Sequence, residues 1–466
     1  MVEKLTSQSA LPDAFREKSR SILIALFFPT IAMILNGSMF GIALPTIRDE
    51  FGMSADMAAW LTIAFSLPFM MLMPLFGRLG DELGRANLLV TGLIIFSLGS
   101  FLAFQADALP MLFVGRLIQG AGASGLTPLT LAIIAQRFSA GERGKAMATW
   151  NATAPATSIF APSIGGFMVD HLGWRAIFLP ALLVAVLAVF ITRWKVPTLR
   201  GKPNWAVLRT FDWGGTLLLA GLITFVVLFV SSRPVTGVDP FQDWRLLSGG
   251  LIFGFSFVRL ERKHARPLID LDILKVRDFR LASLAAAMRM SMMAGIGFLI
   301  PLYLKDNYGL SASGIGLLAT THSISLFLTI RKGGALADQY PNRWLVSIGM
   351  ILQLLAMAYF AALPQGVPLT FIAAGIVVHG MSAGLSLGAL HRTAMGSTDE
   401  AHSGSAAGFY SMTRFAGSML AVALAGIILQ NGLDRGLSVL HAYQLVFAFL
   451  ALTGAVGVLL ALRLQE

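Results

Sequence analysis

The stretch GRLGDELGR at residues 77–85 recurs in outline as GGALADQYPNR at residues 333–343. Both copies contain the pattern Gly-x-Leu-x-Asp, both end on arginine, and each joins two long apolar segments. A polar loop that repeats between apolar segments indicates a chain built from two related halves. Paired halves are typical of secondary transporters, whose substrate site lies between the halves near the middle of the membrane.

The composition of the chain is that of an integral membrane protein. Of its 466 residues, 56% are hydrophobic and only 13% are charged, whereas a soluble protein carries roughly 25% charged residues. Apolar runs long enough to cross a bilayer as helices recur along the chain. The formal charge of +11 is then explained by basic residues kept on the cytoplasmic side, and it does not indicate a nucleic-acid partner. The chain has no cysteine, which excludes disulfides.

The apolar runs predict an all-α fold with fourteen membrane-spanning helices. Their expected ranges are 21–44, 57–77, 87–105, 109–135, 145–168, 175–192, 213–231, 244–260, 279–304, 312–331, 343–362, 367–390, 404–430 and 441–462. The two copies of the repeated loop then lie eight helices apart, which fits two six-helix bundles separated by two extra helices. The expected parts are a cytoplasmic segment at 1–20, a bundle at 21–192, a linker with two helices at 193–260, a cytoplasmic surface loop at 261–278 and a second bundle at 279–466.

The basic residues predict the orientation of these helices. With successive loops on alternate sides, the cytoplasmic segments hold about 26 of the 35 Lys and Arg residues and the outer loops hold about 6. The richest stretches are 193–209 and 259–280, both cytoplasmic in this layout. We therefore expect a multi-pass protein of the plasma membrane, the inner membrane of a bacterium, with both termini in the cytoplasm.

Several motifs resemble those of the major facilitator superfamily, and in particular its fourteen-helix drug:proton antiporter branch. The loop at 77–85 is similar to the superfamily's conformational-switch motif through Gly77, Asp81, Gly84 and Arg85, and the second copy supplies Asp338. The resemblance implies the major facilitator fold and alternating access by rocking of the two bundles. It also implies a monomer that exports amphipathic drugs in exchange for protons.

Further motifs follow in the order that this branch has them. The segment GRLIQGAGASG (115–125) resembles the fourth-helix motif through Arg116 and Gln119. The segment APSIGG resembles the fifth-helix antiporter motif, with Ala161 in place of the usual glycine, and its matching residues are Pro162, Gly165 and Gly166. These three residues are expected to thin or kink the helix for rocking, with simple packing as the alternative. Similar to other segments of the branch are GWRAIFLP (173–180), IPLYL (300–304) and SMTRFAG (411–417).

The first helix departs from the family at a position that matters for proton coupling. The segment ILNGSMFGIALP (34–45) resembles the branch's first-helix motif, but Asn36 replaces the aspartate that is the proposed proton carrier, and Ser38 replaces a threonine. An amide does not titrate, so proton coupling at this position is in doubt. The 24 Asp and Glu residues all fall in loops or at helix ends in this layout, so no buried acid replaces it. Nearest the membrane boundaries are Asp170, Asp212 and Asp306.

Basic side chains, in contrast, do fall inside the predicted spans. They are Arg116, Arg289, Arg414, His322 and His379. A charge in mid-membrane costs at least about 2.5–3.5 kcal/mol, so each arginine should face a cavity or a partner. The histidines are the groups in the spans that titrate near neutral pH, and either a coupling role or a structural role remains open for them.

We expect these residues to form a substrate site together with their neighbours. Met292 and Met293 share a helical face with Arg289, and their adaptable thioethers suit a promiscuous apolar site. Gln119 and Asn36 are expected to line the same cavity, although Asn36 could instead make a hydrogen bond between helices. Glycines 380, 384 and 388 recur every four residues, which predicts a stripe of close helix packing.

The pattern leaves more than one function open. No His-Glu-x-x-His, Gly-x-Ser-x-Gly or phosphate-loop motif appears, so we expect no enzyme, no cofactor and no metal. A drug-efflux transporter is the leading hypothesis, with a small molecule, the lipid bilayer and conceivably protons as partners. Because the predicted spans contain basic side chains but no carboxylates, a facilitator or exchanger of organic anions or lipid-like amphiphiles is the alternative. A non-transporting sensor derived from a transporter is the third candidate, and the intact loop at 77–85 argues against it.

Overall fold

A computed structural model describes residues 13–197, 212–263, 271–398 and 403–465. Parts of the expected segments 1–20, 193–209 and 261–278 therefore lie outside the described residues. The described chain is built of helices joined by short loops, as the apolar runs predict.

The N-terminal bundle consists of α1 (Asp13–Ala25), α2 (Phe27–Glu50), α3 (Ala55–Leu83), α4 (Arg85–Phe104), α5 (Leu109–Ala123), α6 (Leu126–Arg137), α7 (Ala140–Asn151), α8 (Thr153–Leu172), η1 (Trp174–Ile177) and α9 (Phe178–Lys195). The insertion that follows consists of α11 (Trp213–Val230), α12 (Arg233–Thr236) and α13 (Trp244–Glu261). After η2 (Leu271–Lys275), the C-terminal bundle consists of α14 (Arg277–Tyr308), α15 (Ala312–Ala337), α16 (Asn342–Ala362), α17 (Leu369–Gly396), α18 (Ser403–Asp434) and α19 (Val439–Leu462).

Twelve segments of the described chain are long and apolar enough to cross a membrane. The fourteen expected helices include two that are not among these twelve, at 145–168 and 244–260. The first of them is broken at Ala152 into α7, whose start is polar, and α8. The second corresponds to α13, which carries an arginine near each end. The all-helical membrane fold is therefore confirmed, whereas the count of fourteen spans is not.

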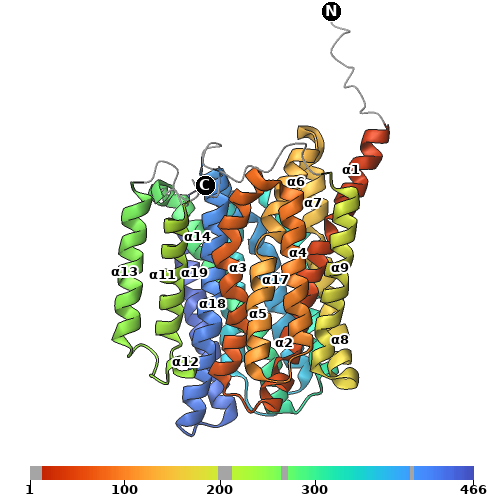
Figure 1. Cartoon of the computed structure of the whole chain (residues 1–466). Coiled ribbons are helices and arrows are strands. Elements are labelled where there is room, and N and C mark those ends of the chain that lie inside the picture. Colours follow the sequence, from red (N-terminus) through yellow and green to blue (C-terminus); the bar gives the residue numbers. More distant parts are fainter. Residues whose placement is uncertain (1–12, 198–211, 264–270, 399–402, 466) are drawn as a thin grey trace, which may run out of the picture.

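The two bundles lie side by side, and the insertion lies at one edge of the molecule (Figure 1). The bundles meet where α8 packs against α15 and where α3 packs against α18. Helix α11 of the insertion contacts both α3 and α18. Helix α1 and the end of the C-terminal bundle lie at one end of the molecule, and the short α12 lies at the other (Figure 1). We call the end that holds α12 the outer end, following the orientation that the basic residues predict.

Glycines bring the site-bearing helices close to their neighbours. A Cβ atom at Gly99 of α4 would lie 2.4 Å from the backbone nitrogen of Gln119, and a Cβ at Gly120 would lie 2.0 Å from the Phe65 carbonyl oxygen. Helix α5 therefore fits between α3 and α4 only because these positions lack side chains. In the same way a Cβ at Gly380 would lie 2.5 Å from the His322 carbonyl oxygen, which confirms close packing at the predicted glycine stripe of α17.

Candidate functional site

A buried polar cluster occupies the middle of the N-terminal bundle. The Gln119 side-chain amide donates hydrogen bonds to the Asn36 carbonyl oxygen at 3.1 Å and to the Ser100 hydroxyl at 3.0 Å. The Arg116 guanidinium donates to the Gln119 carbonyl oxygen at 3.1 Å. All four side chains are at most 2% exposed. The structure thus joins three of the predicted site residues, and Asn36 makes the interhelical hydrogen bond that the sequence left as one alternative.

Aromatic rings cover the charge of Arg116. Its guanidinium carbon lies 3.9 Å from the centre of the Phe40 ring and 4.7 Å from that of Phe65. Cation–π contacts of this kind are worth up to about 2 kcal/mol when desolvated. Together with Gln119, they give this buried cation partners inside its own bundle. The Asn36 NH2 group, in contrast, is buried without a hydrogen-bond partner among the residues that the structure describes.

We expect Gln119→Leu to destabilise the protein, because it removes the partner of the Asn36 carbonyl oxygen and one of the partners of Arg116 and of Ser100. Leaving buried polar groups unpaired costs about 1–3 kcal/mol each, so the thermal unfolding temperature of the detergent-solubilised protein should fall by several degrees. Ser97→Ala is the matched control, because the one hydrogen bond of the Ser97 hydroxyl within the described residues is to the Leu93 carbonyl oxygen of its own helix. Equal unfolding temperatures for the Gln119 and Ser97 variants would contradict the cluster's role.

A histidine pair lies in the C-terminal bundle. The His322 Nε2 and His379 Nδ1 atoms are 3.0 Å apart, and the two rings stack with centres 5.2 Å apart. Gln353 of α16 approaches the other side of His379, with Nε2 to Nε2 at 3.4 Å. Two ring nitrogens bond only when one carries the hydrogen and the other its lone pair, so each histidine fixes the tautomer of its neighbour. The sequence predicted both histidines but neither their pairing nor Gln353.

Two further predicted cations, Arg289 and Arg414, meet at one methionine. Arg289 donates through Nε to the Ser386 hydroxyl at 3.1 Å and through Nη2 to the Ala383 carbonyl oxygen. Its Nη1 atom and the Nη2 atom of Arg414 each lie 3.8 Å from the sulfur of Met290. The thioether beside the two arginines is therefore Met290 and not the predicted pair at 292 and 293.

The predicted methionines lie elsewhere on α14. Met292 is fully buried, and a Cβ at Gly454 of α19 would lie 2.9 Å from its sulfur. Met293 is half-buried. The rotation of α14 decides this placement, because it turns position 292 toward α19 and leaves position 290 beside Arg414.

Ion pairs and backbone contacts join the two bundles at the outer end. Arg48 at the end of α2 pairs with Asp306 of α14 at 2.6 Å, and the Tyr443 hydroxyl donates to the same carboxylate at 2.6 Å. Asp170 at the end of α8 accepts hydrogen bonds from the backbone nitrogens of Ala312 and Ser313 at 3.0 and 2.8 Å. These contacts hold the two bundles together at this end of the molecule.

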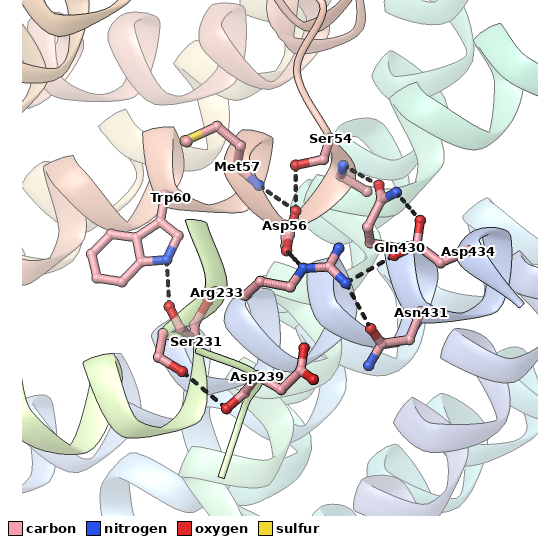
Figure 2. Close-up of polar contacts among 12 residues, drawn as sticks. Ser54, Asp56, Met57, Trp60, Ser231, Arg233, Asp239, Gln430, Asn431 and Asp434 are labelled. Atoms are coloured by element: carbon pink, nitrogen blue, oxygen red, sulfur yellow. Dashed lines mark hydrogen bonds and ion pairs between the residues drawn. The ribbon is translucent and has the colours of Figure 1, made fainter. Parts of the chain in front are cut away.

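The insertion contributes a clasp to the outer end, which we define as Arg233 with Asp56, Asn431 and Asp434 (Figure 2). Arg233 pairs with Asp56 of the N-terminal bundle at 3.1 Å and with Asp434 of the C-terminal bundle at 2.8 Å. It also donates to the Asn431 side-chain oxygen at 3.2 Å. Asp56 is only 2% exposed. One arginine thus neutralises carboxylates from both bundles.

The fifth-helix motif lies in the contact between α8 and α15. A Cβ at Gly166 would lie 2.3 Å from the Ala312 carbonyl oxygen, and a Cβ at Gly316 would lie 2.4 Å from the Pro162 carbonyl oxygen. Gly165 faces the other way, toward Met39 of α2. The hydroxyls of Ser163 and Thr320 are 2.7 Å apart in the same contact. Close packing between the bundles is thus present at this motif, and its expected role in rocking stays a prediction.

The two switch loops lie at the end opposite the clasp. Gly84 has a backbone φ of +94°, which suits glycine and makes the expected tight turn. Arg85 donates to the Ala132 carbonyl oxygen at 2.8 Å, and Asp338 pairs with Arg392 of α17 at 2.6 Å. The side chain of Asp81 lies outside the described part of the chain, and a side chain at Gly77 would meet open space.

A groove of about 520 Å³ runs between α2 and α7–α8 of the N-terminal bundle. Its walls are mostly apolar, with the hydroxyls of three threonines, and it includes none of the predicted site residues. Its lining is Phe27, Ile31, Leu35, Thr149, Ala152, Thr153, Ala156, Thr157 and Phe160. The groove is shallow and open to its surroundings, and Phe160 in its lining is 66% exposed.

Sequence reasoning missed Arg48, Arg233 and Tyr410. A signal existed for Arg233, because an arginine between the two extra helices lies on the side that basic residues avoid. No comparable signal existed for Tyr410 at the start of α18. Tyr410 is of interest because its hydroxyl is buried and has no hydrogen-bond partner among the described residues, which depends on the helices that pack around it.

Comparisons with known proteins agree on the class of this fold. The family model described as Major Facilitator Superfamily matches residues 26–259 and 282–466. Riboflavin transporter RibZ of Clostridioides difficile (strain 630) is 28% identical over 366 residues, 78% of each chain. Multidrug transporter protein MdtP of Bacillus subtilis (strain 168) is 30% identical over 334 residues, 71% of this chain and 60% of MdtP. A bacterial homolog of the human lysosomal transporter Spinster, solved in an inward-facing and occupied conformation, superposes with a TM-score of 0.66 at 15% identity, covering 94% of this chain and 95% of that one.

Proposed function

The chain belongs to the major facilitator superfamily, and we propose that it is a secondary transporter that exports amphipathic small molecules by alternating access. The observation that carries this proposal is the set of contacts between the two bundles at the outer end, where ion pairs and closely packed glycines join them. Relatives named as multidrug transporters support the substrate class. We further propose a bacterial plasma membrane with both termini in the cytoplasm.

The apolar groove in the N-terminal bundle supports an amphipathic substrate. Phe27, Ile31 and Phe160 offer rings and aliphatic carbon, while the threonine hydroxyls offer hydrogen bonds without a fixed charge. Such a lining binds molecules for their apolar bulk and tolerates variety in their polar groups. The buried arginines lie outside this groove, so the apolar and charged parts of the interior are separate.

We propose that transport here does not use the first helix as its proton carrier. Asn36 accepts from Gln119, and an amide has no proton to exchange at physiological pH. The carboxylates that the structure places within spans lie at helix ends, such as Asp56 paired with Arg233 and Asp306 paired with Arg48. Each of these two carboxylates is thus held in an ion pair with an arginine at the outer end.

Reconstituted proteoliposomes test the function directly. N-phenyl-1-naphthylamine and 8-anilinonaphthalene-1-sulfonate share one ring skeleton and differ by a sulfonate, so they probe neutral and anionic amphiphiles. We expect saturable movement of at least one of them above the rate of protein-free liposomes. We also expect an imposed pH gradient to persist during that movement. If neither dye moves, the proposal is contradicted. If the pH gradient collapses while a dye moves, transport is coupled to protons, and His322 and His379 become the residues to mutate.

A further inference from the structure

Arg289 and Arg414 form an unneutralised pair of cations in the C-terminal bundle. Within the described residues neither has an Asp or Glu in salt-bridge contact. Arg289 is 3% exposed, and one edge of its guanidinium donates hydrogen bonds to the Ala383 carbonyl oxygen and the Ser386 hydroxyl. Its Nη1 atom and the Arg414 side chain both turn to the sulfur of Met290, each at 3.8 Å. A thioether is a weak acceptor, so it does not balance two guanidinium groups.

A hydroxyl that has no hydrogen-bond partner within the described residues lies near this pair. The Tyr410 hydroxyl is buried and makes no hydrogen bond in the described structure. The guanidinium carbon of Arg414 lies 5.5 Å from the centre of the Tyr410 ring, and the His391 ring lies 5.7 Å from it. Buried hydroxyls are nearly always paired, so an unpaired one beside two cations indicates a place where an acceptor binds.

A residue adjacent to Arg414 contacts the other bundle. Phe415, next to Arg414 in α18, makes an edge-on ring contact with Phe69 of α3 at 4.9 Å. Arg414 and Met290 are partly exposed, whereas Arg289 and Tyr410 are buried. A solute that reaches Arg414 along this interface would therefore have an apolar wall on one side and three hydrogen-bond donors on the other.

We propose that Arg289, Arg414 and Tyr410 form a subsite for the anionic group of an amphipathic substrate, a carboxylate or a sulfonate. This inference rests on the proposed transport function and names its substrate class. Guanidinium groups bind planar or tetrahedral oxyanions through two parallel hydrogen bonds. Both arginines contact one sulfur atom, so a single small anion is large enough to reach both of them. The ring system of the substrate then packs on Met290 and the phenylalanines at the interface.

The test compares the same two naphthyl dyes as ligands of the purified protein in detergent. The chain has 8 tryptophans. Energy transfer from tryptophan to the dye therefore reports dye that is bound to the protein. We expect Arg289→Gln and Arg414→Gln to raise the Kd of the sulfonate dye at least about tenfold, the scale of a lost charge-assisted hydrogen bond. The Kd of the neutral dye should stay within about twofold of the wild type.

Tyr410→Phe provides a second test of the subsite if an arginine variant fails to fold. It removes a hydroxyl that has no partner in the described structure, so stability should be preserved while the sulfonate dye loses about threefold or more in affinity. Arg245→Gln is the control, because Arg245 is an exposed arginine of the insertion. It should leave the affinities of both dyes unchanged.

The outcomes separate this inference from the proposed function. Three results would each overturn the subsite. The Kd of both dyes could change in parallel, the Kd of the sulfonate dye could stay unchanged in all three variants, or the wild-type protein could bind the neutral dye but not the sulfonate dye. If wild-type proteoliposomes move the neutral dye in any of these cases, the proposed function still stands. If they move neither dye while sulfonate binding depends on the arginines, the subsite stands and the proposed function fails.

Discussion

Alanine at Gly166 or at Gly316 reduces transport at least about fivefold while the protein remains folded. Each new Cβ would lie within 2.4 Å of a backbone carbonyl oxygen on the opposite helix, and backbone atoms cannot rotate away as a side chain can. Helices α8 and α15 must then separate, which holds the outer end open. Overpacking of this kind costs about 1–3 kcal/mol, which corresponds to roughly 5–150-fold in the equilibrium between open and closed ends.

The absence of native cysteine makes this expectation directly measurable. Cysteines placed at Ser163 and Thr320, whose hydroxyls are 2.7 Å apart, should form a disulfide readily in the parent protein and slowly in either alanine variant. Gly297→Ala is the matched control, because a Cβ at that position of α14 would meet no atom within 4 Å. Unchanged cross-linking together with full transport in the Gly166 and Gly316 variants would refute the proposed closure.

The second large effect is expected at Arg233. Replacing it with methionine leaves the carboxylates of Asp56 and Asp434, one from each bundle, without the cation between them. Removing one partner of a fully buried ion pair costs about 3–5 kcal/mol. Because the Arg233 side chain is 27% exposed, water screens part of the interaction. We therefore expect the substitution to cost about 1–2 kcal/mol. The closed outer end should lose roughly 5–30-fold in population.

A single cysteine at Ala55 reports this opening. Ala55 is 4% exposed, and its backbone nitrogen donates to Gln430 of α18 at 2.8 Å, so a membrane-impermeant maleimide reaches it only when α3 and α18 separate. We expect labelling to become faster by about the same 5–30-fold in the Arg233→Met variant. Arg245→Met is the control, because Arg245 is 67% exposed and its ion-pair partner in the described part of the chain is Asp243 of its own insertion. Equal labelling rates for the two variants would show that the clasp does not hold the bundles.

The candidate site was only partly predictable. Asn36, Arg116 and Gln119 were identified from local motifs, and the structure places them in one hydrogen-bonded cluster. Met292 and Met293 were predicted from the helical face that they share with Arg289, and their role in a substrate site stays a prediction. That the sulfur of Met290 lies beside Arg289 and Arg414 was not predictable, because the face of α14 that meets α18 is set by helix rotation. Hydropathy along an apolar helix does not encode that rotation, since lipid-facing and core-facing positions are equally apolar.

The sequence by itself determined the membrane class, the superfamily and the positions of the switch loops. These depend on the length of apolar runs and on motifs within ten residues, which the chain displays directly. The tertiary structure alone decided that His322 meets His379, that Arg233 binds Asp56 across 177 positions of sequence, and that Arg289 and Arg414 share one methionine. Such contacts arise from the packing of helices distant in sequence, where a glycine at one helix and a backbone oxygen at another fix which side chains face each other.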